Sequence, residues 1–147
     1  MQVFSDEDFM KEALKEAQKA FEKDEVPIGA VVVCQNQIIA RCHNLTEQLN
    51  DVTAHAEMQA ITSAANYLGG KYLNECVVYV TLEPCIMCGG ALFWSKLGKL
   101  VYGAYDPKNG FTSAEKNLLH PKTRIVGGVL EEDSLSLLRS FFKSKRK

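Results

Sequence analysis

The chain has 147 residues, 46% of them hydrophobic and 24% charged, with a formal net charge of −1, which fits one globular domain over residues 1–147 with a full core. No apolar run approaches the length of a membrane span, and the acidic start MQVFSDEDFMKEA differs from a signal peptide, so we expect a cytoplasmic protein. Five cysteines without a secretion signal argue against a disulfide framework and leave metal binding or catalysis open.

The first predicted elements are a helix and a pair of strands. Apolar residues recur at helical spacing over residues 5–23, and Ser5 is typical of a helix start. The segments IGAVVVC (28–34) and QIIARC (37–42) are predicted strands joined by a tight turn over residues 35–37. Because this connection is so short, the two strands are antiparallel and the sheet is not purely parallel.

Two further helices and a central strand are predicted next. A polar loop leads to Thr53, which we expect to be the N-cap of a helix over residues 54–67. The apolar run VVYVTL (77–82) suits a strand covered on both faces. Pro84 then stands where a proline is tolerated, at the first turn of a helix over residues 85–94.

The last third of the chain predicts two strands and a helix. KLVYGA (99–104) is a fourth strand, and TRIVGGV (123–129) is a weaker fifth one. Residues 105–122 between them form a long loop, and apolar residues within 135–142 mark a C-terminal helix. Alternating strands and helices predict an α/β fold, a three-layer α/β/α sandwich with a five-stranded mixed sheet.

Two short segments, AHAE and EPCIMC, concentrate the residues that carry chemistry. His55, Cys85 and Cys88 are three ligands of the kinds that zinc prefers, and a catalytic zinc keeps three protein ligands with a fourth position open to water. Both segments are expected at helix N-termini, where partial positive charge favours thiolates. Glu57, two positions beyond His55, can accept a proton from water and return it to a leaving group.

Each of these residues also has a simpler interpretation when it is taken alone. His55 fits a buried histidine with a hydrogen bond, and Glu57 fits a solvated helix residue. A structural zinc site closed by Cys76, Cys42 or His43 is the alternative for the whole group. The combination H-x-E with P-C-x-x-C is nevertheless a signature of zinc-dependent deaminases, which predicts one catalytic zinc ion per chain.

At these residues the sequence resembles the zinc-dependent deaminases of the cytidine deaminase-like superfamily, most of all bacterial tRNA-specific adenosine deaminases. The resemblance covers nearly the whole chain, through EVPIGAVVV, HN, DVTAHAEMQAI, YVTLEPCIMCGGAL and VYGAYDPKNG. It implies a hydrolytic enzyme that converts the wobble adenosine of tRNA to inosine with release of ammonia. It also implies a homodimer that binds the tRNA anticodon loop.

The resemblance assigns a role to each matching position. It makes His55, Cys85 and Cys88 the zinc ligands and Glu57 the catalytic proton carrier. The remaining assignments fall into two groups. The substrate pocket would comprise Asn44, Ala56, Val26, Pro27 and Ile28. The RNA contacts would comprise Asp106, Lys108, Phe142, Lys145 and Arg146.

The segment after the fourth predicted strand and the basic C-terminus leave other functions open. The segment GFTSAEKNLLHPKTRIVGG is shorter than its counterpart in typical tRNA deaminases and lacks their Asn-His pair. A free nucleobase or nucleoside deaminase acting on guanine or cytosine is therefore the first alternative. A non-catalytic zinc-binding partner subunit is the second alternative, against which Glu57 argues. Lys143, Lys145, Arg146 and Lys147 supply four of the 17 positive charges, so the C-terminus either contacts phosphates or solubilises the chain.

Overall fold

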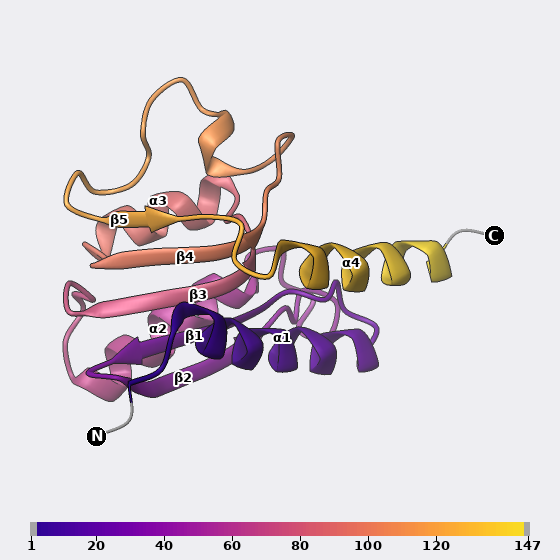
Figure 1. Cartoon of the computed structure of the whole chain (residues 1–147), viewed down its shortest axis with the longest axis horizontal. Coiled ribbons are helices and arrows are strands. Elements are labelled where there is room, and N and C mark those ends of the chain that lie inside the picture. Colours follow the sequence, from indigo (N-terminus) through magenta and orange to yellow (C-terminus); the bar gives the residue numbers. More distant parts are fainter. Residues whose placement is uncertain (1–2, 146–147) are drawn as a thin grey trace.

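In a computed structural model, which describes residues 3–145, a five-stranded mixed sheet lies between two layers of helices (Figure 1). This confirms the predicted α/β/α sandwich. The elements in chain order are α1 (Asp6–Glu22), β1 (Gly29–Cys34), β2 (Gln37–His43), α2 (Ala56–Leu68), β3 (Cys76–Leu82), α3 (Ile86–Trp94), β4 (Lys99–Ala104), the short 3₁₀ helix η1 (Phe111–Ser113), β5 (Arg124–Val126) and α4 (Glu131–Lys145).

The strands lie in the order β2-β1-β3-β4-β5. Strand β1 is antiparallel to both β2 and β3, whereas β4 is parallel to β3 and to β5. The turn between β1 and β2 has two residues, because Gln37 already pairs with Cys34. Gln35 and Asn36 both have positive φ, 52° and 64°, as the tightest hairpin turns require.

The two faces of the sheet are both apolar, which explains the unbroken apolar runs in β1 and β3. Ala30 and Val32 face the core under α2 and α3. Their neighbours Val31 and Val33 face the second core, where α1 packs with Phe9. Figure 1 shows α1 and α4 on the near face of the sheet and α2 and α3 behind it.

Both central helices begin one or two residues later than the sequence predicts. Thr53 is not an N-cap; its backbone N–H and its hydroxyl both donate to Asp51 Oδ1, at 2.8 and 2.7 Å. The N-cap of α2 is His55, and the N-cap of α3 is Cys85, with Pro84 just outside the helix. Neither N-cap side chain makes a capping hydrogen bond, so both are available for another task.

The end of the chain differs in detail from the prediction. Strand β5 covers only Arg124–Val126, because Gly127 lies against the ring of Tyr102 and Gly128 turns the chain at φ 84°. The loop over residues 105–122 contains η1 and projects beyond the sheet (Figure 1). Within residues 3–145, no helix combines the length and the hydropathy that a membrane span requires.

Replacing Gly29 with Ala is expected to destabilise the protein strongly, since α1 lies directly on this residue. A Cβ atom there would lie 2.1 Å from the carbonyl oxygen of Ala13 and 2.4 Å from the backbone nitrogen of Ala17. The expected loss of unfolding free energy is about 3 kcal/mol, measured by chemical denaturation. Gly90→Ala is the control: it meets no atom within 4 Å and should gain about 0.5–1 kcal/mol. Equal stability of the two variants would contradict this packing.

Candidate active site

The three predicted metal ligands lie together. The possible ligand atoms of His55, Cys85 and Cys88 all lie within 4.8 Å of one another. Among residues 3–145, these three side chains form a group that could hold a metal ion. The Nδ1 atom of His55 is 3.6 Å from the sulfur of Cys85 and 3.5 Å from that of Cys88. Zinc bonds to nitrogen and sulfur in a tetrahedron separate such atoms by about 3.6 Å, so the donor set fits zinc.

The fold brings these ligands together by pointing two helix N-termini at one place. His55 and Cys85 occupy the N-caps of α2 and α3, and Cys88 follows in the first turn of α3. A hydrogen bond from Cys88 and backbone N–H groups lower the pKa of Cys85 to about 5, against the effect of burial. The same pairing raises the pKa of Cys88, so one thiolate is already present before a metal binds.

Glu57 lies beside this cluster without being one of its ligands. It stands in the first turn of α2 and is only 4% exposed. Burial raises the pKa of Glu57 to about 7, opposed by a backbone hydrogen bond and by His55. A carboxyl group near neutrality can both accept and return a proton, which is what the predicted acid/base role requires.

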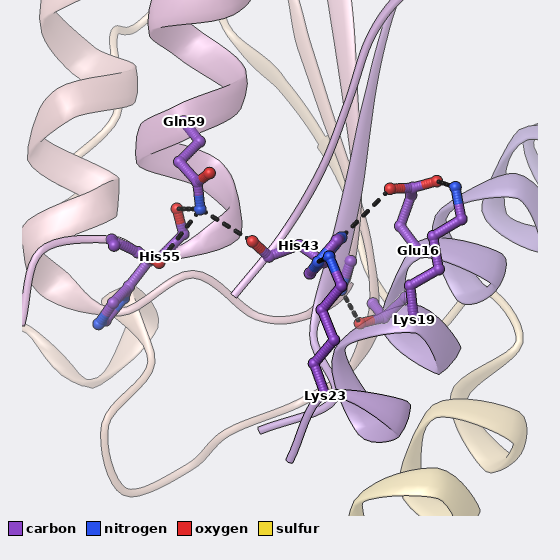
Figure 2. Close-up of polar contacts among 9 residues, drawn as sticks. Glu16, Lys19, Lys23, His43, His55 and Gln59 are labelled. Atoms are coloured by element: carbon purple, nitrogen blue, oxygen red, sulfur yellow. Dashed lines mark hydrogen bonds and ion pairs between the residues drawn. The ribbon is translucent and has the colours of Figure 1, made fainter. Parts of the chain in front are cut away.

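Gln59 fixes the start of α2, although sequence reasoning did not identify it. Its side-chain nitrogen donates to the carbonyl oxygen of His43 at 2.8 Å and to that of Ala54 at 3.2 Å, and it reaches His55 O at 3.5 Å (Figure 2). On the other side of β2, the His43 ring faces the buried carboxylate of Glu16. The sequence shows only that Gln59 lies one helical turn beyond His55, which places the two side chains on the same face of α2. It does not show that the Gln59 amide bonds the backbone before the helix.

Asn44 and Ala56 are joined by a hydrogen bond. The Ala56 N–H donates to Asn44 Oδ1 at 3.0 Å, and both residues are buried. The amide oxygen of Asn44 therefore faces the protein, so its NH₂ group is the end that can donate to a bound base. Their predicted contacts with substrate stay predictions.

A cleft of about 520 Å³ opens next to the ligand cluster. Its lining includes Glu57 and two of the metal ligands, His55 and Cys85. Of the predicted substrate and RNA contacts, it includes Ile28, Asp106 and Lys108. Val26 instead lines a separate cleft, between the end of α1 and α4. Pro27, the next residue in the chain, is buried.

The other predicted RNA contacts lie away from the cluster or outside the described residues. Lys145 lines the cleft that contains Val26, and its ammonium group pairs with Asp24. Phe142 is exposed on α4. Arg146 lies outside the described residues. The role of each in RNA binding stays a prediction.

The remaining cysteines do not close the metal centre. Cys42 lies near Glu16, and burial raises its pKa to about 11. Cys34 and Cys76 face each other across β1 and β3. His43 is engaged with Glu16, as described above. None of these residues belongs to the donor cluster, so the closed structural zinc site is not formed by them.

Metal-free protein should react with iodoacetamide at Cys85 before any other cysteine. Its pKa of about 5 leaves it as thiolate at neutral pH, whereas Cys42, with a pKa of about 11, remains a thiol. Labelling of Cys85, followed by peptide mass spectrometry, should slow as pH falls through 5 and should stop when zinc is added. Cys42 labelling as fast as Cys85 would contradict this arrangement.

Comparison with known proteins agrees with this geometry. Residues 4–104 match the family model described as cytidine and deoxycytidylate deaminase zinc-binding region. The chain is 50% identical to the tRNA-specific adenosine deaminase of Bacillus subtilis (strain 168), covering 97% of this chain and 91% of that protein. It is 47% identical to the tRNA-specific adenosine deaminase of Aquifex aeolicus (strain VF5), covering 94% of each.

A solved structure gives the same result at the level of the fold. The structure comes from work on A-to-I editing by tRNA:A34 deaminases, and it superposes with a TM-score of 0.83 at 43% identity. The superposition covers 89% of this chain and 99% of that one. The chain therefore belongs to the zinc-binding cytidine and deoxycytidylate deaminase family.

Proposed function

We propose that this protein is a zinc-dependent hydrolase that converts the wobble adenosine of tRNA to inosine and releases ammonia. The observation that carries this proposal is the set of three donors at zinc-ligand spacing beside the buried carboxyl group of Glu57. The relatives supply the substrate, since those at 50% and 47% identity are tRNA-specific adenosine deaminases.

His55, Cys85 and Cys88 would hold the metal, which when bound lowers the pKa of a water molecule from about 16 towards 7. The carboxylate of Glu57 accepts a proton from the attacking water and delivers it first to a ring nitrogen of the base. It then takes the remaining proton from the hydroxyl group added to the ring carbon and passes it to the exocyclic amine, so that the carbonyl group forms as the C–N bond breaks and ammonia leaves. The NH₂ group of Asn44 donates to the base and orients its ring over the cluster.

The RNA would enter as a single-stranded loop, since a base must leave its stack to reach the cleft. Asp106 and Lys108 stand at the cleft and are placed to contact nucleotides beside the target base. Phe142 and Lys145 on α4 offer an exposed aromatic ring and a cation further along the surface. Stacking and phosphate contacts of this kind are general for single-stranded nucleic acids.

The proposal includes four further properties. The whole of residues 1–147 forms one deaminase domain, it holds one zinc ion, and it acts in the cytoplasm, where its tRNA substrate is. We also infer a homodimer, which is supported by large exposed apolar side chains on α2 and α3, namely Tyr67, Ile86 and Trp94. Light scattering of the purified protein measures this state directly.

Replacing Glu57 with Gln should leave zinc bound while it nearly abolishes turnover. The side chain is not a ligand, but its proton transfer contributes about 100- to 10,000-fold to rate. Inosine formation in an anticodon stem-loop measures activity, and elemental analysis measures zinc. A Glu57→Gln variant with parental activity would refute the assigned chemistry.

The substrate is tested by comparing RNA with free bases under the same conditions. We expect inosine in the anticodon stem-loop and no comparable ammonia release from guanine, cytosine or their nucleosides. Ammonia from a free base but no inosine would favour the nucleobase deaminase. No turnover of either, with zinc bound, would favour the non-catalytic partner subunit.

Deleting residues 143–147 should weaken RNA binding without removing zinc. In the parent protein, the four Lys and Arg side chains of this segment would displace counterions from the RNA when they contact phosphates. Without them, the slope of log affinity against log salt concentration should become shallower by about 3. Binding of a fluorescent stem-loop across a salt series measures this slope. An unchanged slope would make the basic tail a solubilising end.

A further inference from the structure

Glu83 is a buried carboxylate whose hydrogen-bond partners are all neutral. It is 2% exposed and directly follows β3, two residues before the ligand Cys85. Its Oε1 atom accepts from the N–H of Asp106 at 3.1 Å. Its Oε2 atom accepts from the N–H and the hydroxyl of Thr112, at 3.0 and 2.7 Å.

These three bonds offset the cost of burying the charge, which would otherwise be large. They also hold both ends of one loop segment, since Asp106 begins it and Thr112 ends it. The residues between them include Lys108 and Asn109, which line the cleft with Asp106. One side chain thus fixes the part of the loop that forms this rim of the cleft.

Backbone contacts join the same loop segment to the segment that carries the metal ligand. The N–H of Phe111 donates to the carbonyl oxygen of Pro84 at 2.8 Å, and Gly110 forms an isolated β-bridge with Cys85. A Cβ atom on Gly110 would lie 1.9 Å from Glu83 Oε2. Only glycine therefore fits between the carboxylate and the loop.

We infer that Glu83 is a positioning residue that holds residues 106–112 against the metal-ligand segment, so that substrate RNA meets a preformed rim. The inference deepens the proposed function and rests on it for the substrate. Glu83 is outside the metal-donor cluster, and both its oxygens accept hydrogen bonds from the loop. Glu83 also lines the cleft, but because both its oxygens are occupied by hydrogen bonds from the loop, its effect is exerted through the loop.

A second buried carboxylate organises a different loop and provides an internal comparison. Glu25 is fully buried, and its two oxygens accept from the N–H groups of Glu47 and Gln48, at 3.0 and 2.7 Å. These residues belong to the loop between β2 and α2. Each carboxylate thus organises its own loop, and a variant of one should leave the other loop unchanged.

Hydrogen–deuterium exchange of the zinc-loaded protein tests the positioning directly. Glu83→Gln replaces an acceptor with a donor, so amide exchange over residues 106–112 should rise by about tenfold or more, while residues 47–48 keep their protection. Glu25→Gln should show the reverse pattern. Glu115→Gln, at an exposed position in the same loop, should show the same amide exchange as the parent over residues 106–112 and over residues 47–48.

Steady-state kinetics with the anticodon stem-loop test the effect on function. Glu83→Gln should raise KM by about tenfold and leave kcat within about threefold, because the rim is lost and the metal centre is kept. Thr112→Val, which removes one of the three bonds at an exposed residue, should raise KM by less, and Thr112→Ser should restore it. Gly110→Ala should resemble Glu83→Gln.

The outcomes separate this inference from the proposed function. A parent protein that forms no inosine overturns the proposed function, and exchange still decides whether Glu83 holds the loop. Unchanged exchange over residues 106–112 in Glu83→Gln, or faster exchange throughout the core as well, overturns the positioning role. If Glu83→Gln fails to fold or to bind zinc, the comparison of Thr112→Val with Thr112→Ser decides. Equal KM values for these two variants would overturn the positioning role.

Discussion

Three donor atoms must lie within bonding distance of one cation, and this requirement organises the rest of the structure. The mixed sheet meets it by directing the N-termini of α2 and α3 to one place, with His55 and Cys85 at the two N-caps. The hydrogen bond from the Cys88 side chain, together with backbone N–H groups at the start of α3, lowers the pKa of Cys85 in its partly buried position. The architecture therefore lowers the cost of forming a thiolate before the metal arrives.

Buried carboxylates perform distinct tasks around this centre, and their partners decide which. Glu57 lies against the thiols with a raised pKa, which suits proton transfer. Glu83 and Glu25 instead accept hydrogen bonds from backbone N–H groups and hold loops in place. The same chemical group thus suits proton transfer in one place and holds loops in two others, because local donors differ.

The sequence predicts the parts of this structure that have local or recurring signals. Apolar runs identify the buried strands, and the spacing of His55, Cys85 and Cys88 identifies the donor set without any coordinates. The helix start at Thr53 is wrong because Asp51 competes for that side chain, which the sequence does not reveal. Glu83 and Gln59 escape notice for a different reason: they bind backbone groups, and a backbone group has no residue-specific signature.

The positions of His55 and Cys85 at the two N-caps have a consequence for assembly. Neither N-cap side chain makes the usual capping hydrogen bond, and at the start of α2 the side chain of Asn44, from outside the helix, accepts from the Ala56 N–H instead. A bound metal would in addition tether the two helix starts to each other through His55 and Cys85, which would couple cation uptake to the final ordering of α2 and α3. A chain that has not acquired its ion thus differs from a loaded one in backbone order as well as in reactivity.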